Sequence, residues 1–170
     1  MSNNRAFTLV ELLVVSLVLI VLVGLAIYFI NPYEIVKLRH DADRMLNLGE
    51  LQYRINSAVY EATESGVIDI LCKEKASYPC TGSSQRGSRS FDGSGWVKAV
   101  LQSELPTDPV NDVTYHYTYC ANSDGWEIDT VFESKKEKGK MKTDGGNEDD
   151  KFEIGTNLKL IASSDGSCIY

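Results

Sequence analysis

Positive charge and histidine are both scarce in this sequence, and each scarcity argues against a class of function. Of the 170 residues, 17 are Lys or Arg and 24 are Asp or Glu, which gives a formal net charge of −7 at pH 7. Because nucleic-acid binding draws its affinity from clustered cations, no direct binding to nucleic acid is expected. The two histidines, His40 and His116, fall in a predicted helix and a predicted strand. No Ser or Cys stands in a recognisable nucleophile motif. We therefore expect a protein that is not an enzyme.

The cysteines lack C-x-x-C spacing, which argues against a zinc site. In a chain with a membrane-targeting start, an even set of four favours two disulfides formed in an oxidising compartment. Of the three possible connectivities we favour Cys72–Cys80, which closes a short loop, and Cys120–Cys168, which ties the last residues to a predicted strand. Buried free thiols are the alternative.

Charge is also nearly absent from the N-terminal part of the chain. Residues 7–30 hold a single side chain that is charged at neutral pH, Glu11, and only Ser16 and Gly24 interrupt the apolar run over 12–30. The run is close to the ~20 residues that a helix needs to cross a bilayer. A cleaved signal peptide is the alternative, but it requires a shorter apolar stretch followed by a small-residue cleavage site. The segment therefore predicts a spanning helix.

Glu11 is unusual in such a segment. A carboxylate there costs on the order of 2.5–3.5 kcal/mol, so it normally marks a functional pairing. The alternative is that Glu11 extends toward the membrane interface near the helix end. Around it, a short basic leader precedes a small residue, an aromatic residue and the Glu, in the order Arg5-Ala6-Phe7-Thr8-Leu9-Val10-Glu11-Leu12-Leu13. This stretch resembles the processing site of the type IV pilin family.

The resemblance implies a sequence of events in the membrane. A prepilin peptidase cuts between Ala6 and Phe7, the new amine is N-methylated, and Glu11 pairs with the Phe7 amine of a neighbouring subunit. It also implies an inner-membrane precursor, partners in further copies of the chain and in the inner-membrane assembly machinery, and a final place at the cell surface. The chain departs from the family pattern at Ala6, where Gly is common, and its flexible residues stand at Gly24 and Pro32.

The expected organisation has four parts: a leader over 1–6, a transmembrane or filament-core helix over 7–31, an amphipathic helix over 32–64 and a globular head over 65–170. Pro32 disfavours helix at Asn31 and predicts a kink or break there. The second helix carries apolar residues at three- and four-residue steps, which predicts a face packed on a sheet. They are Ile35, Leu38, Ala42, Met45, Leu48, Leu51, Ile55 and Val59.

In the head, residues 65–95 are rich in Ser and Gly and predict a loop pinned by Cys72 and Cys80. We predict a short amphipathic helix over 96–105. Alternating runs predict strands over 113–120 and 126–132, joined by a hairpin turn over 121–125, and a further strand over 158–162. The fold class is therefore α+β, with a long helix packed on a small antiparallel sheet, as the resemblance to pilins implies.

Acidic residues recur in the head over 105–112 and 144–150. These two segments resemble the C-terminal region of the major pseudopilins of type II secretion, many of which bind calcium there. Ca²⁺ takes 6–8 oxygen ligands from carboxylates, amides and carbonyls. The candidate ligands are Asp144, Asn147, Asp149 and Asp150, with Asp108 as a further candidate. A solvated run of charge is the alternative. No other cofactor is expected.

The sequence predicts a structural subunit of a type IV pilus-like extracellular filament. Two alternatives stay open. The Ser- and Gly-rich loop and the disulfides favour a pilus, with adhesion as one role, whereas the acidic loop favours a pseudopilin of type II secretion. The remaining alternative is an unassembled single-span membrane protein whose ectodomain binds a ligand.

Overall fold

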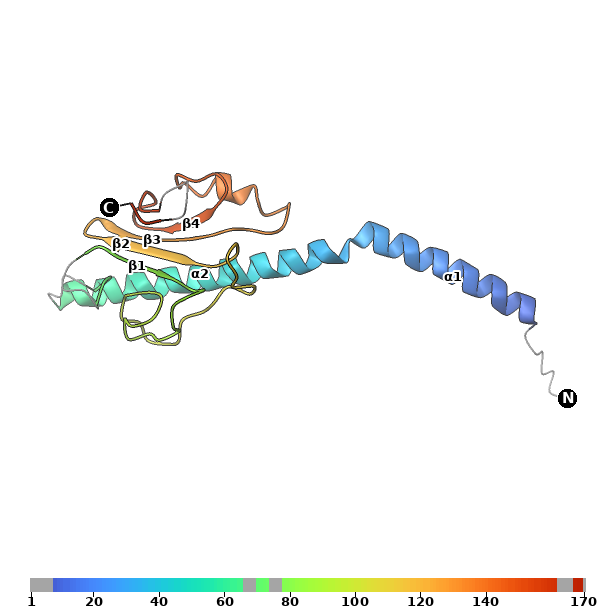
Figure 1. Ribbon diagram of the computed structural model, residues 1–170, viewed down its shortest axis with the longest axis horizontal. Helices are drawn as coiled ribbons and strands as arrows, with labels where there is room; N and C mark the ends of the chain where they lie inside the picture. Colours follow the sequence, from blue (N-terminus) through green and yellow to red (C-terminus); the bar gives the residue numbers. More distant parts are fainter. Residues whose placement is uncertain (1–7, 66–69, 74–77, 162–166, 170) are drawn as a thin grey trace. The chain divides into compact units, whose positions relative to one another are not determined.

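The computed structural model describes residues 8–65, 70–73, 78–161 and 167–169 (Figure 1). Its elements follow in the order α1 (Leu9–Ile30), α2 (Pro32–Glu64), β1 (Cys80–Ser83), β2 (Thr118–Asn122), β3 (Gly125–Thr130), the short 3₁₀ helix η1 (Lys140–Lys142) and β4 (Phe152–Gly155). The chain divides into two compact units, Met1–Val36 and Lys37–Tyr170, which are described separately.

The apolar helix α1 has a capping residue at each end, Thr8 and Asn31. Thr8 is its N-cap, with extended backbone angles and a hydroxyl that accepts the Glu11 N–H at 3.2 Å. The helix ends at Asn31, whose left-handed conformation (φ 45°) lets its N–H reach the Ile27 carbonyl at 3.2 Å. Helix α2 then starts at Pro32, a residue suited to a first helical position because it has no N–H to lose. The predicted interruption at Asn31 is therefore confirmed.

In the second unit, α2 supplies part of the main apolar core. Leu48, Leu51 and Ile55 are fully buried and cluster with Trp126 and Ile128 of β3. The predicted core face is thus confirmed in its central part. It is wrong at Ile35 and Ala42, which are exposed.

The four strands form one antiparallel sheet in the order β1-β2-β3-β4. A two-residue turn at Ser123 and Asp124 joins β2 to β3, because Asn122 pairs directly with Gly125. The predicted hairpin is therefore confirmed, as is the α+β class with a long helix on a small antiparallel sheet (Figure 1).

The predicted helix over 96–105 is wrong. Its apolar residues Trp96, Leu101 and Leu105 are buried, but their backbone N–H groups do not bond four residues back. Trp96 donates to the Ser88 carbonyl at 3.0 Å, and Leu101 and Leu105 donate to the carbonyls of residues 91 and 89 at 2.7 and 2.9 Å. The segment is a loop paired with residues 88–91, so the spacing of apolar residues reflected burial and not a helix.

The predicted strand boundaries also differ. The first run becomes strand only at Thr118, because the Asp112 carboxylate accepts the N–H groups of Thr114 and Tyr115 at 2.8 and 2.7 Å and folds residues 112–115 into a turn. The second strand ends at Thr130, two residues before its predicted end. Strands β1 and β4 were not predicted.

The strand predicted over 158–162 is reduced to an isolated bridge between Ile161 and Cys168, and residue 162 lies outside the described part of the chain. The fourth strand of the sheet is instead β4, whose Ile154 pairs with Ile128. Residues 158–161 lie against the sheet by other contacts, which involve a carboxylate of β3.

Candidate functional site

The first candidate site is the N-terminal end of α1. Glu11 lies in the first turn and is exposed, and within the described residues its carboxylate has no hydrogen-bond or ion-pair partner. A carboxylate at this position also complements the partial positive charge of a helix N-terminus, which is the structural alternative to a functional role. Ala6 and Phe7 lie outside the described residues, so the cleavage and the pairing with Glu11 stay predictions.

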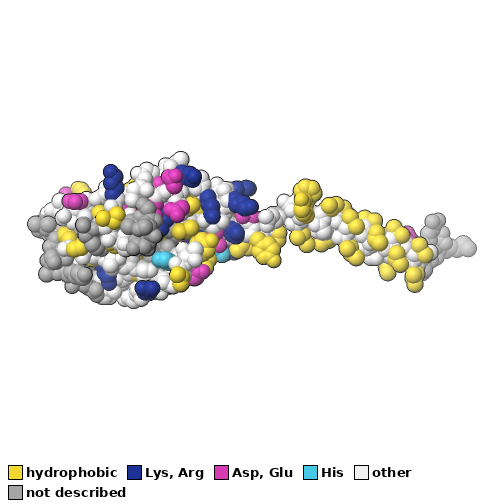
Figure 2. Space-filling view, turned by 45° about the horizontal axis from the view of Figure 1, so that its top comes forward, with side chains coloured by type: hydrophobic (Ala, Val, Ile, Leu, Met, Phe, Trp, Pro, Cys, Tyr) yellow, Lys and Arg dark blue, Asp and Glu magenta, His cyan; other side chains and the backbone are white. Residues whose placement is uncertain are grey.

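The surface of α1 is apolar on all sides. The described large side chains between Leu9 and Phe29 are 49% to 80% exposed, and hydrophobic atoms cover the visible face of this helix in Figure 2. The Ser16 hydroxyl donates to the Leu13 carbonyl at 2.8 Å, so it needs no external partner. One helical stretch within Leu9–Glu64 is long and apolar enough to cross a membrane. A surface of this kind requires lipid or other apolar helices around it.

A buried ion cluster joins α2 to the loops of the head. Arg44 is fully buried and binds Asp108 through two hydrogen bonds of 2.6 and 2.9 Å, and its Nη1 lies 2.8 Å from both Asp41 and Glu133. Burial lowers the pKa of Arg44, but the hydrogen bonds and charge of Asp108 raise it more, so the guanidinium stays charged. His40 Nδ1 lies 2.9 Å from Glu133 Oε1 at the same cluster.

Sequence reasoning missed this cluster and gave one of its members a different predicted role. Asp108 was a candidate calcium ligand, yet both its oxygens bind Arg44, and its Oδ1 also accepts the N–H groups of Val110 and Asn111. The sequence contains one indication of this cluster. Two charged residues, Asp41 and Arg44, lie on the helix face whose other residues are apolar and predicted to be core.

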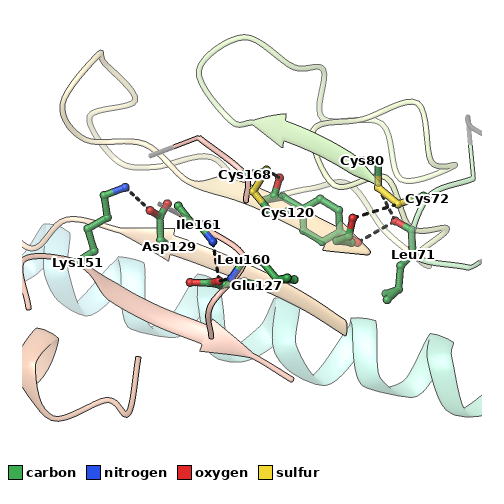
Figure 3. Close-up of a disulfide and its surroundings, with 12 residues drawn as sticks. Leu71, Cys72, Cys80, Cys120, Glu127, Asp129, Lys151, Leu160, Ile161 and Cys168 are labelled. Atoms are coloured by element: carbon green, nitrogen blue, oxygen red, sulfur yellow. Dashed lines mark hydrogen bonds and ion pairs between the residues drawn. A yellow bond between two sulfur atoms is a disulfide. The ribbon is translucent and has the colours of Figure 1, made fainter. Parts of the chain in front are cut away.

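Buried carboxylates lie on the face of the sheet that is opposite to the core formed with α2 (Figure 3). Glu127 and Asp129 lie on the same face of β3, and Glu153 of β4 pairs in register with Asp129. Glu127 Oε2 accepts the N–H groups of Leu160 and Ile161 at 2.6 and 3.1 Å. Glu127 therefore fixes the C-terminal segment on the sheet.

The neighbouring loop is organised by the remaining carboxylates. Glu153 accepts the N–H groups of Asn147 and Glu148 at 3.4 and 3.0 Å. Asp144 accepts the N–H groups of Gly146 and Glu153 at 3.1 and 2.9 Å. The Lys151 ammonium pairs with Asp129 of β3. The carboxylates of Glu153 and Asp144 thus replace backbone pairing that the irregular loop cannot supply.

Burial changes the acidity of two of these groups. It raises the pKa of Glu127 to about 8, helped by the hydrogen bond and the charge of Glu153. It raises the pKa of Glu148 to about 6, although the charge of Lys151 acts in the opposite direction. The carboxyl of Glu127 therefore holds a proton at neutral pH.

The calcium candidates do not meet at one point. Both oxygens of Asp144 accept backbone N–H groups, Asp149 and Asp150 are exposed, and the Asn147 side chain lies beside Ile161 and Glu153. Across residues 8–65, 70–73, 78–161 and 167–169, no group of three His, Cys, Asp or Glu side chains is arranged to hold a metal ion. The arrangement shown does not fit an ion, and calcium binding stays a prediction that requires the loop to rearrange.

The structure pairs the cysteines as favoured from the sequence, Cys72 with Cys80 and Cys120 with Cys168. The first pair closes the loop that leads into β1. The second pair joins β2 to the C-terminal segment that Glu127 also holds, and it packs with Leu160 and Ile161 in a small second core (Figure 3). A disulfide and a buried carboxylate thus fix the same segment.

Comparison with known proteins identifies the N-terminal part of the chain. Residues 1–27 match the family model of the prokaryotic N-terminal methylation motif. Searches of curated proteins and of solved structures gave no match. The matched residues include the predicted cleavage site, Glu11 and most of α1. With the α+β head described above, the motif indicates a prepilin-type protein of the type IV pilin-like or pseudopilin class.

Proposed function

We propose that this chain is a structural subunit of a type IV pilus-like extracellular filament. Prepilin peptidase processes it between Ala6 and Phe7, and the mature chain assembles through α1. The observation that supports this most strongly is an apolar helix with exposed sides and one carboxylate, Glu11, within a methylation motif. The proposed role is mechanical and involves no catalysis.

The chemistry of assembly follows from that carboxylate. Cleavage before Phe7 creates an amine at the start of the mature helix. In a neighbouring copy this cation and the Glu11 carboxylate neutralise each other, at about 4 kcal/mol of Coulomb attraction for charges 4 Å apart in an effective dielectric of 20. Apolar contacts alone do not favour filament over lipid, because both surroundings are equally apolar. The charge pair therefore supplies the specificity and sets the axial register.

The membrane-anchored precursor fits the motif and the apolar helix. We place it in the inner membrane, with residues 1–6 in the cytoplasm and residues 65–170 on the opposite side, where disulfides form. Its partners in this account are the peptidase, the inner-membrane assembly machinery and further copies of the chain. The final location is the cell surface.

Mass spectrometry of the N-terminal peptide, from the chain recovered at the cell surface, tests this proposal. A mature chain that begins at Phe7, with a methylated amine, supports it. A chain that begins at Met1 contradicts it and favours the unassembled single-span membrane protein.

A pseudopilin of type II secretion is the second candidate, and the acidic residues of 144–150 favour it through their resemblance to calcium-binding pseudopilins. If calcium binds, the melting temperature of the head rises when Ca²⁺ replaces a chelator, because a ligand that binds only the folded state stabilises it. An unchanged melting temperature removes the calcium prediction. The matched control is Mg²⁺, which demands a stricter octahedral geometry.

A further inference from the structure

Lysine is concentrated in one segment of a chain that is otherwise acidic. Residues 135–142 hold five Lys and one Glu, whereas the whole chain has a formal net charge of −7. Lys135, Lys136 and Lys138 are exposed. Among the residues that the structure describes, no carboxylate forms an ion pair with Lys136 or Lys138. A solvated run of charge is the ordinary interpretation of such a segment, so its surroundings decide whether it has a role.

The buried ion cluster holds this segment against α2. The Asp41 carboxylate accepts the N–H groups of Glu133 and Ser134 at 2.9 and 2.7 Å. Further along the segment, Lys140 Nζ lies 3.3 Å from Met45 Sδ. The lysine segment therefore lies beside the first turns of α2 in the second unit.

Two further cations stand on α2 just before this contact. Lys37 and Arg39 are exposed, and neither has an ion-pair partner in the described part of the chain. Lys37 precedes Asp41 by four residues, so it lies on the same side of the helix as the lysine segment. On the visible face in Figure 2, Lys and Arg side chains gather at this end of the second unit. We call Lys37, Arg39, Lys135, Lys136 and Lys138 together the basal patch.

The exposed charges at the basal patch have one sign. Within 37–42 and 133–142, every charged residue that is exposed is Lys or Arg. The acids of these two ranges are buried or half-buried, and each is paired: Asp41 and Glu133 with Arg44, and Glu137 with Lys140. Asp149 and Asp150 line a shallow hollow together with Lys138 and mark the edge of the patch. The patch therefore presents positive charge outward.

The place of the patch along the chain indicates its partner. The aromatic residues Tyr28, Phe29 and Tyr33 stand at the end of the apolar run and are 80%, 79% and 82% exposed. Exposed aromatic side chains at the end of a spanning helix lie at the level of the lipid headgroups. Lys37 follows Tyr33 by about one turn of α2, or about 6 Å along the helix axis. This is less than the Debye length of about 8 Å at physiological ionic strength, so charged headgroups act on it.

We propose that the basal patch binds anionic phospholipids of the membrane that anchors the precursor. The inference rests on the membrane-anchored precursor of the proposed function. Each Lys or Arg that reaches an anionic membrane surface strengthens binding about fivefold. The acidic remainder of the chain repels a polyanion that wraps the head, whereas a flat membrane surface contacts this end alone. The patch holds the head against the membrane before assembly and is released when the subunit leaves the lipid.

Lipid competition on the full chain in detergent tests the patch. Native mass spectrometry counts bound phosphatidylglycerol and phosphatidylcholine, offered at equal concentration with identical acyl chains, so that α1 distinguishes neither. The wild type is expected to bind the anionic lipid at least about tenfold more. The double variant Lys136→Gln, Lys138→Gln is expected to lower this preference at least about fivefold, because two exposed cations are lost.

The matched control also removes two exposed cations, but outside the patch. The double variant Arg86→Gln, Lys159→Gln is expected to keep the preference of the wild type. Both double variants are expected to keep the wild-type melting temperature, since all four side chains are exposed. Equal preferences for the two double variants overturn the proposal.

A fluorescent label locates the headgroups relative to the head. Gly139→Cys places the label in open space within the lysine segment, and Ser123→Cys places it at the exposed β2–β3 turn. The full chain is reconstituted in bilayer nanodiscs whose lipids carry a quencher on the headgroup. Quenching at 139 is expected to be stronger in anionic than in neutral nanodiscs, and high salt removes the difference. The label at 123 is expected to give equal quenching in both, and equal quenching at 139 overturns the proposal.

The outcomes separate this inference from the proposed function. A wild-type chain that is absent from the membrane fraction of cells refutes the membrane-anchored precursor and the inference together. A membrane-embedded wild type that shows no preference for the anionic lipid refutes the inference alone. A label at 139 that responds only to a second copy of the chain, and not to the lipid, assigns the patch to protein contacts and also overturns it.

Discussion

The buried carboxyl of Glu127 makes the stability of the head depend on pH. The pKa of Glu127 is about 8 in the folded chain, against about 4.3 for an exposed glutamate in the unfolded chain. A group whose pKa is raised by folding contributes stability that is complete below the unfolded pKa and is lost as the pH rises to the folded one. The head is therefore expected to be less stable at pH 8 than at pH 5.

The magnitude follows from the two pKa values. Between pH 5 and pH 8 the linkage relation gives a loss on the order of 3–4 kcal/mol in the free energy of unfolding from this one group. Glu148, whose pKa is raised to about 6 by burial, acts in the same direction over the lower part of the range. Glu127→Gln removes the contribution of Glu127 to the pH dependence and leaves that of Glu148. The amide oxygen of the new side chain still accepts the N–H groups of Leu160 and Ile161.

The assay is denaturant unfolding of the full chain in detergent at pH 5 and pH 8, followed by near-ultraviolet circular dichroism of the buried Trp96 and Trp126. Glu127→Gln is expected to show a much smaller pH dependence than the wild type. Glu104→Gln, at a mostly exposed side chain, is the control and keeps the wild-type dependence. A wild-type chain equally stable at both pH values, or a variant with an unchanged slope, refutes the reasoning.

Three further predictions concern stability, measured by unfolding of the same full chain. Arg44→Met is expected to cost roughly 3–5 kcal/mol because it leaves buried carboxylates without their cation; a loss under 1 kcal/mol contradicts this role. Gly146→Ala is expected to cost about 1–3 kcal/mol, since a Cβ there stands 1.8 Å from the Glu153 carboxylate, whereas Gly139→Ala, in open space, costs none. Cys120→Ser is expected to cost about 2–4 kcal/mol, and an unchanged midpoint argues against the pairing.

The sequence predicts well those features that depend on local chemistry. The break at Asn31 follows from Pro32, and the β2–β3 hairpin follows from two alternating runs around a polar turn. The membrane-spanning length follows from an apolar run that only two residues interrupt. In each case a few adjacent residues decide the outcome, so no knowledge of distant contacts is needed.

Features decided by distant contacts were not predictable in the same way. Residues 96–105 carry helical spacing, but their N–H groups bond residues 88–91, a choice made by tertiary packing. The buried position of Arg44 depends on Asp108, sixty-four residues later in the chain. Strand β4 begins next to charged residues and forms because it pairs with β3. The pattern of residues within one strand does not reveal such pairing.

The same difference between local chemistry and distant contacts decides which residues of the candidate site could be predicted. Glu11 could be identified because a carboxylate in an apolar run is anomalous on its own. The predicted calcium ligands were chosen by composition, and composition does not distinguish an acid that binds an ion from one that, like Asp144, accepts backbone N–H groups. The buried glutamates Glu127 and Glu153 were missed because they alternate with apolar residues as exposed ones do.

Assembly through a charge pair at the N-terminus is the central claim, and Glu11→Ala tests it most directly. The measurement is electron microscopy of the sheared surface fraction from cells that express either the wild type or the variant at equal membrane levels. Abundant filaments from the wild type and few or none from Glu11→Ala are the predicted result. Filaments of equal number and length from both chains contradict the account.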